Sequence, residues 1–220
     1  SGKSFGVINP AIRQLVGKGF CLCIYDFKFP DLAQIAYYHY LLKKKNDPNY
    51  HHKFHVVNLD QVEYSRRVNP FKKEYINTLA QAQEMAESMV TALQKGGGSG
   101  GGGSEAFFTQ SAVNFLASTI YYFATYDNGK YSDLPHILAF MNRSYQEIFD
   151  TLFTNEELTS LMSPFKSAYE NKAFDQLEGQ VGTVKIFLSR LATKESFWVF
   201  SGDEVQLKIS DRTDPSILIL

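Results

Sequence analysis

The spacing of apolar residues at the start of the chain predicts alternating helices and strands. Residues 3–17 have a helical period, and Pro10 within them predicts a kink or a late start. Residues 20–25 are wholly apolar, which is typical of a strand buried on both faces. A helix over 31–42 and a strand over 54–58 follow. Because such alternation needs right-handed crossovers, the sequence predicts a parallel sheet.

The middle of the chain has helical periodicity almost throughout. Long helices are predicted over 73–95, 105–126 and 174–191, each with an apolar stripe. Between the last two, N-cap residues mark the starts of shorter helices: Asp133, Ser144, Asn155 and Ser163. Pro135 and Pro164 stand near first-turn positions, which proline tolerates because it has no N–H to lose there.

Strand patterns return near the C-terminus, at residues 197–200, 205–209 and 217–220. The sequence therefore predicts an α/β fold with an inserted all-helical domain. Residues 1–71 begin the sheet domain, 72–190 form the helical domain, and 191–220 return to the sheet.

A run of glycine and serine interrupts the helical region at 96–104. It holds seven of the 15 glycines and has no apolar group to bury, so it is predicted to be a flexible coil. An engineered linker and a native glycine-rich loop both explain it.

Composition narrows the classes of protein that fit. The 220 residues are 44% hydrophobic, which excludes disorder for most of the chain. A formal charge of -1 excludes a histone-like binder, so any DNA contact requires a local basic patch. The two cysteines cannot form a disulfide framework or a four-cysteine zinc site. The sequence also lacks an 18-residue apolar run that would predict a membrane span.

The strongest chemical signal is the tripeptide Gly2-Lys3-Ser4, which matches the second half of G-x-x-x-x-G-K-[ST]. Phosphate binding uses backbone N–H groups at a helix N-terminus, a lysine charge and a hydroxyl that ligates Mg²⁺. Gly2, Lys3 and Ser4 supply one of each, directly before a helix that leads to a buried strand. The alternative is an expression scar or a chance match.

Both ends predict that the chain is an excerpt of a longer protein. The N-terminus lies inside the half-motif, and Pro215–Leu220 is an apolar run with nothing after it. We therefore expect nucleotide to stabilise the isolated chain little or not at all; a large ATP-dependent shift lost in Lys3→Ala would contradict this.

Asp26 and Lys28 follow the first predicted strand, where open α/β sheets bind ligands. They fit either a polar group near phosphates or metal, or a turn-forming Asp beside a solvated Lys.

Other polar residues give weaker signals. Zinc binding is disfavoured for the histidines because their spacing matches no common finger: His39, His51, His52 and His55. Cys21 and Cys23 are expected to pack in the core, since C-x-C is not the C-x-x-C redox pair. Arg66 and Arg67 fit either a phosphate or DNA contact or a plain surface pair.

The chain resembles the TraG/TraD-type coupling proteins of bacterial conjugation. Four short motifs carry the resemblance, in this order along the chain: Gly2–Ser4, Tyr25–Lys28, Val57–Asp60 and Arg66–Phe71. Residues 106–116 look like the start of that family's all-alpha domain. Residues 174–202 are similar to the branch of the family found on mobile elements of gut anaerobes. The resemblance spans nearly the whole chain, and its specificity lies in the order of short motifs.

The resemblance implies a membrane-anchored hexameric ATPase with a RecA-like P-loop core. Such a protein delivers single-stranded DNA with its relaxase to a type IV secretion channel. Lys3 would then hold the β- and γ-phosphates of ATP and Ser4 would ligate Mg²⁺, in a site that includes Ser1, Gly2 and Asp26. Asp26 falls in the family's Asp-Pro-Lys-Gly position, where Phe27 replaces the proline and Phe29 the glycine.

The same resemblance implies an anchor before Ser1, a Walker B acidic residue after Leu220, and a helical domain that meets the relaxosome and DNA. Two other interpretations stay open. The chain is a non-enzymatic module that recognises protein or DNA cargo, or it belongs to another P-loop ATPase such as a DNA translocase or a packaging motor.

Overall fold

A computed structural model describes residues 2–95 and 103–220, apart from the side chains of residues 95 and 103–108. The chain divides into two compact units. The first unit joins residues 1–68 to 202–220, and the second, helical unit contains 69–201. The sequence predicted the helical domain over 72–190, so its observed limits lie three residues earlier and eleven residues later. Most of the glycine-serine run lies outside the described residues.

The first unit contains a small parallel sheet of three strands: β1 (Leu22–Ile24), β2 (Lys53–Val56) and β3 (Ser216–Ile219). The strand order is β1-β3-β2, so the segment nearest the C-terminus lies in the centre. Leu218 pairs with Cys23 on one side and with His55 on the other. All four residues of β3 are buried, Ser216 and the apolar run Ile217–Ile219, as expected for a strand between two neighbours in a parallel sheet. The predicted parallel pairing is confirmed.

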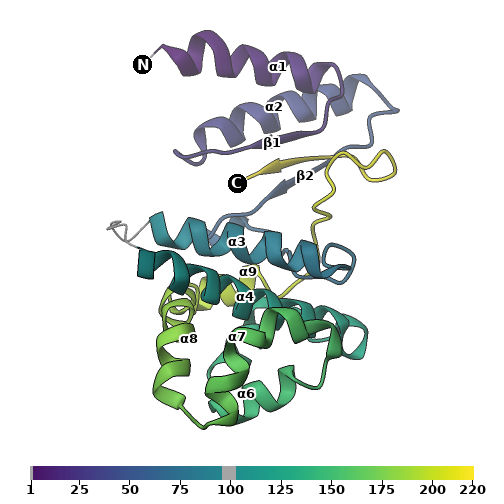
Figure 1. The fold of residues 1–220 in the computed structure, drawn as a ribbon. Coiled ribbons are helices and arrows are strands. Elements are labelled where there is room, and N and C mark those ends of the chain that lie inside the picture. The colour runs from purple at the N-terminus through teal and green to yellow at the C-terminus, as the bar shows by residue number, and fades with distance from the viewer. Residues whose placement is uncertain (1, 96–102) are drawn as a thin grey trace. The chain divides into compact units, whose positions relative to one another are not determined.

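Two helices cover one face of this sheet. The chain is helical from Lys3, first as a π-helix (η1, Ser4–Ile8) and then as α1 (Asn9–Gly17), and α2 spans Asp31–Asn46. Figure 1 shows α1 and α2 on the same side of the strands. The shared core contains Ile12 and Val16 of α1, Ala36 of α2, and Ile217 and Ile219 of β3. The predicted helices 3–17 and 31–42 are therefore confirmed.

Pro10 explains the widened first turns of the N-terminal helix. It stands at the start of α1, directly after the π-helical segment. Its ring would clash with the carbonyl four residues earlier, and it has no N–H to donate. The Asn9 N–H instead bonds to the Ser4 carbonyl, five residues back. The helix absorbs the proline by widening rather than by stopping.

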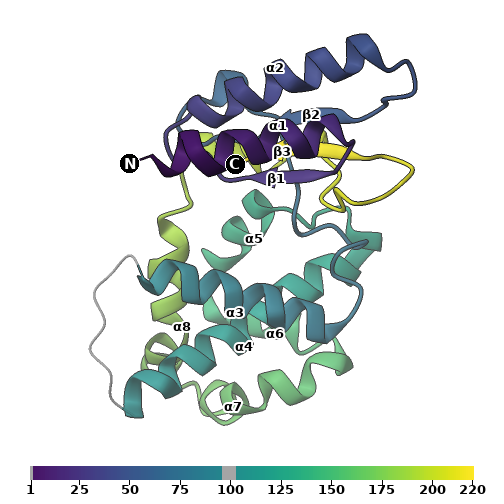
Figure 2. The same cartoon turned by 90° about the horizontal axis from the view of Figure 1, so that it is seen from above.

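The helical unit carries α3 to α9, and Figures 1 and 2 both show α3 lying along α4. Its α-helices are α3 (Leu79–Lys95), α4 (Gly103–Thr125), α5 (Leu134–Met141), α6 (Tyr145–Leu152), α7 (Thr159–Glu170), α8 (Phe174–Ser189) and α9 (Lys194–Val199). Single 3₁₀ turns lie at Glu156–Leu158 in this unit and, as η2, at Val62–Tyr64 in the first, while Tyr126–Gly129 is a turn with left-handed backbone at Asp127 and Asn128. Three fully buried rings centre its core: Phe115, Phe149 and Phe165, with centroids 5.8 to 6.2 Å apart.

The prediction of a RecA-like P-loop core is wrong. The described residues are mostly helical, with one small sheet whose strands have three or four residues each. Doubly wound parallel sheets carry helices on both faces, whereas α1 and α2 lie on one side here. Two of the predicted strands, 197–200 and 205–209, are not strands.

Local packing explains both of these errors. Residues 194–199 form α9, where Thr193 accepts a hydrogen bond from the Ser196 N–H as the N-cap. Ser196 and Val199 are buried three positions apart, which is the spacing of a helix rather than of a strand. In the run 205–209 only Val205 is buried, so the alternation of apolar and polar residues there does not mark a sheet face.

Three of the four predicted N-caps are confirmed. Asp133, Ser144 and Asn155 each accept a backbone N–H at the start of a helical segment. Ser163 is instead inside α7, as is Pro164. The N-cap of α7 is Leu158, five residues before the predicted Ser163, because Glu156–Leu158 leads directly into the helix.

None of the helices within the described ranges, 2–95 and 103–220, has the length and apolar character needed to cross a membrane.

Candidate functional site at the carboxyl ends of the strands

The predicted phosphate-binding residues lie at the exposed start of the N-terminal helix. Lys3 and Ser4 are exposed, and the Gly6 N–H donates to the Gly2 carbonyl at 2.8 Å, which fixes the first turn. Neither η1 nor α1 has an acidic residue in its first turn. The partial positive charge of this helix end is therefore not neutralised by a neighbouring carboxylate on the helix. Ser1 lies outside the described residues.

Figures 1 and 2 both place the start of this helix on the side of the first unit where β1 and β3 end. Asp26 is held at that edge, since its N–H donates to the Leu220 carbonyl at 2.7 Å. The structure therefore brings the N-terminal tripeptide and Asp26 to the same side of the sheet.

Asp26 has a structural role that the sequence did not reveal. Its side chain is only 5% exposed, and Oδ2 accepts the N–H groups of Leu32 and Ala33, each at 2.9 Å. These are orphan donors of the first turn of α2, whose N-cap position is occupied by Pro30 and makes no side-chain bond. Asp26 thus caps α2 from five residues before the helix begins. Its other oxygen, Oδ1, is buried and has no hydrogen-bond partner among the described residues.

The residues on either side of Asp26 point outward. Tyr25 is 71% exposed and Phe27 is 83% exposed, with their ring centroids 6.5 Å apart. Lys28 is exposed as well. This turn therefore presents two aromatic rings and one ammonium group to solvent beside the buried carboxylate.

The cysteines do not pack in the core as predicted. Cys23 is exposed and Cys21 is half-buried; Cys23 lies on β1, which is an outer strand of the sheet. Cys21 Sγ lies 3.8 Å from His52 Nε2. Burial is the largest cause that lowers the pKa of His52, whose ring stacks on Tyr50 at 4.4 Å. No group of three or more potential metal ligands occurs in the described part of the chain.

The two arginines differ in their surroundings. Arg67 Nε donates to Glu204 Oε1 at 3.0 Å, while Arg66 has an exposed side chain and its N–H donates to the Val56 carbonyl at 2.7 Å. Arg67 therefore joins two distant segments of the first unit, which is a structural role.

A hollow of about 530 Å³ lies between α1 and α2, next to the N-terminal turn. Arg13 and His39 are its ionisable lining residues, and Phe5 stands at its N-terminal end. Burial and then the nearby Arg13 charge lower the pKa of His39. The hollow therefore offers one permanent positive charge and a ring that stays neutral to lower pH than usual.

The sequence patterns missed a second hollow, between α2 and β2, whose lining includes four aromatic side chains. The residues that form it come from three consecutive elements, α2, β2 and η2, and their side-chain types match no motif.

No protein-family model, curated protein or solved structure matches the chain.

Proposed function

We propose that the chain is part of a coupling protein of bacterial conjugation, an ATPase that delivers relaxase-bound single-stranded DNA to a type IV secretion channel. One observation carries the proposal. A helix begins at Lys3 with an exposed, uncompensated N-terminus, on the side of a parallel sheet where its strands end. Helix N-termini in this position are common sites for phosphate groups.

The N-terminal residues fit ATP and Mg²⁺ by the chemistry of their donors. The Lys3 ammonium would neutralise the β- and γ-phosphates, and the Ser4 hydroxyl would ligate the metal ion. When bound, Mg²⁺ supplies charge neutralisation of the phosphate oxygens. Gly2 leaves its backbone accessible, since a Cβ there would meet no atom within 4 Å. The Asp26 carboxylate fits less directly, because its Oδ2 is already bound to the start of α2.

In this proposal the helical unit, residues 69–201, meets the relaxosome and the DNA. The intact protein is a homo-hexamer on the cytoplasmic face of the inner membrane, held there by an anchor outside this chain. The formal charge of -1 does not oppose DNA binding, because a basic channel can form from local patches when subunits assemble.

A second candidate is a non-catalytic module in which the helical unit recognises relaxosome protein or DNA cargo. The observation that favours it is the engagement of Asp26 in a helix cap, which removes one polar group from a nucleotide site. The helical unit also has a hydrophobic core of its own.

The test compares two lysine variants in the intact protein. Lys3 starts the helix and Lys18 follows its last turn, and both side chains are exposed. We expect Lys3→Ala to lower conjugal DNA transfer by about 100-fold, since it removes a charge that stabilises the transferred phosphoryl group. Lys18→Ala is the matched control and should transfer DNA normally.

Binding of relaxase and DNA separates the two candidates. Loss of transfer in Lys3→Ala with binding retained supports the ATPase. Normal transfer in Lys3→Ala would refute a nucleotide role for the tripeptide and leave the recognition module.

A further inference from the structure

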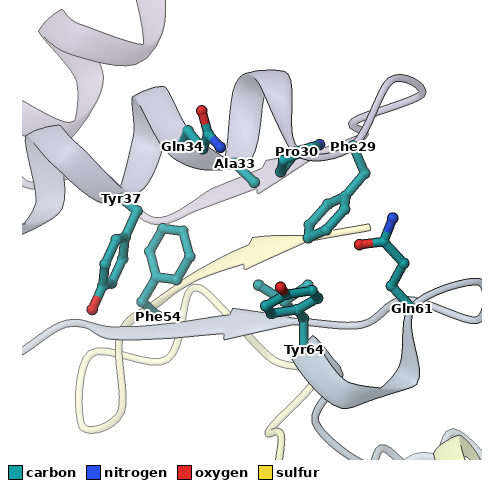
Figure 3. A pocket seen from close by; sticks show the side chains of 9 residues that line it. Phe29, Pro30, Ala33, Gln34, Tyr37, Phe54, Gln61 and Tyr64 are labelled. Carbon is teal, nitrogen blue, oxygen red and sulfur yellow. The ribbon is translucent and has the colours of Figure 1, made fainter.

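The first unit has a hollow of about 410 Å³ beside the outer strand β2. Its walls come from the start and middle of α2, from β2, and from the loop that ends in the 3₁₀ turn η2. The volume is within the range of roughly 300–1,000 Å³ that is usual for small-molecule sites. Figure 3 shows the side chains around this space.

Four of the nine lining residues are aromatic. Figure 3 shows Tyr37 and Phe54 on one side of the space and Phe29 and Tyr64 on the other. The Tyr37 and Phe54 rings meet edge to face with centroids 5.1 Å apart, and Phe29 and Tyr64 are 6.0 Å apart. Tyr64 is 60% exposed, so a large part of its ring has no covering group. Such faces favour a flat ring that can stack on them.

The polar groups of the lining are neutral. Apart from the tyrosine hydroxyls, they are the side-chain amides of Gln34 and Gln61, and no charged side chain lines the space. Figure 3 draws Gln61 on the side of the space that Phe29 and Tyr64 occupy. An amide both donates and accepts hydrogen bonds, so it can pair with the mixed donor and acceptor edge of a heterocycle. A phosphate or carboxylate would find no counter-charge among these residues.

The loop that carries Gln61 and Tyr64 is held by its own hydrogen bonds. Asn58 Oδ1 accepts the Gln61 N–H at 2.9 Å, and the Asn58 N–H donates to Ser65 Oγ at 3.0 Å. Ser65 is buried, and its N–H donates to the Val62 carbonyl at 3.0 Å. The aromatic wall on this side is therefore preorganised, which lowers the entropic cost of binding.

We propose that this hollow is a binding site for a neutral, planar heteroaromatic ring of the size of a nucleobase. The ring stacks against Tyr64 and Phe54, and the Gln61 amide bonds to its polar edge. A free nucleoside and an unpaired base of a nucleic-acid strand share this chemistry. The inference is independent of the function proposed above, because it uses none of the residues at the N-terminal tripeptide or at Asp26.

The experiment titrates the whole chain with adenosine and follows the binding by NMR, with ribose as the probe that has no base. We expect saturable binding of adenosine and none of ribose. Tyr64→Ala should weaken adenosine binding at least about tenfold, which corresponds to 1.4 kcal/mol of lost stacking. Gln61→Leu keeps the side-chain size, removes the amide, and should also weaken binding.

The matched control is Tyr38→Ala. Tyr38 is 62% exposed on α2, close to the exposure of Tyr64, but it does not line the hollow. Adenosine binding should be unchanged in this variant, and an unchanged amide spectrum shows that each variant is folded. A short oligodeoxyadenylate then identifies the source of the ring: tighter binding than adenosine indicates a strand, and weaker binding a free nucleoside.

Three results would overturn the proposal. The first is the absence of saturable adenosine binding to the folded chain. The second is an equal loss of affinity in Tyr64→Ala and Tyr38→Ala. The third is binding of a tryptophan-containing peptide at this site without binding of adenosine, which would make the hollow a protein-docking site.

Discussion

Helix α2 has no N-cap side chain of its own, and a residue outside the helix takes that role. Pro30 occupies the N-cap position of α2 and cannot satisfy the first-turn donors, so the carboxylate of Asp26 does it from outside the helix. The same residue is tied to the last residue of the chain through its N–H. Asp26 therefore couples the start of α2, which its carboxylate caps, to the edge of the sheet, which its backbone N–H contacts.

Replacement of Asp26 tests this coupling. Asp26→Ala leaves the Leu32 and Ala33 N–H groups without an acceptor, and we expect a loss of about 2 kcal/mol in the free energy of unfolding of the first unit. Hydrogen exchange of these two amides should accelerate accordingly.

Asp31→Ala provides the control, because Asp31 lies in the first turn of α2 and has an exposed side chain. Its loss should weaken only the dipole interaction, by less than about 1 kcal/mol. Equal effects of the two substitutions would show that Asp26 is not the cap.

Two serines that the sequence predicts as N-caps have different positions in the structure. Ser144 was predicted as an N-cap, and it forms a complete capping box with Glu147 at the start of α6. Ser163 carries the same local signal, but the helix around it starts earlier, and its hydroxyl donates to the Ser160 carbonyl instead of capping a helix start. A cap signal is therefore reliable only where the preceding residues do not themselves continue the helix.

The two serines give a matched comparison at this scale. Ser144→Ala should destabilise the helical unit by about 1 kcal/mol, since it removes a cap bond. Ser163→Ala should change the stability by less than about 0.5 kcal/mol. Urea unfolding followed by fluorescence of the single tryptophan, Trp198, measures both. A larger effect at Ser163 would show that it contributes to helix initiation after all.

At the scale of the whole chain, residues far apart in sequence close the first unit. Arg67 and Glu204 are separated by 137 positions and pair through both side chains and backbone. Gly202 allows this approach, because a Cβ at that position would lie 2.4 Å from Arg67 Cβ. The helical unit, residues 69–201, is inserted in the sequence between these two segments.

This pair predicts a pH dependence. Bonds from the Arg67 backbone and side chain lower the pKa of Glu204 below its ordinary value of 4.5. Its contribution to stability is therefore present above that value and is lost as the pH falls through the lowered pKa of the folded state. The pair is partly exposed, so we expect less than about 1 kcal/mol.

Glu204→Gln is the variant that tests it. The stability of the first unit, measured by urea unfolding between pH 3 and pH 7, should fall less steeply below the ordinary glutamate pKa in this variant. An unchanged slope would mean that the pair contributes nothing to folding.

The sequence by itself located the long helices, although α3 begins at Leu79 rather than at residue 73, together with the parallel pairing of the short strands and three of the four predicted caps. These features depend on periodicity and on contacts within a few residues, which a single sequence records. It also placed the N-terminal tripeptide directly before a helix, because Gly2-Lys3-Ser4 is a local motif.

Only the tertiary structure decided the size of the sheet, the exposure of Cys23 and the role of Asp26. Each depends on which segments become neighbours: β3 pairs with both β1 and β2, so β1 remains an outer strand. The aromatic hollow likewise needs Phe29, Phe54 and Tyr64 to be brought together from different elements. Long-range packing sets these distances, and local periodicity contains no record of it.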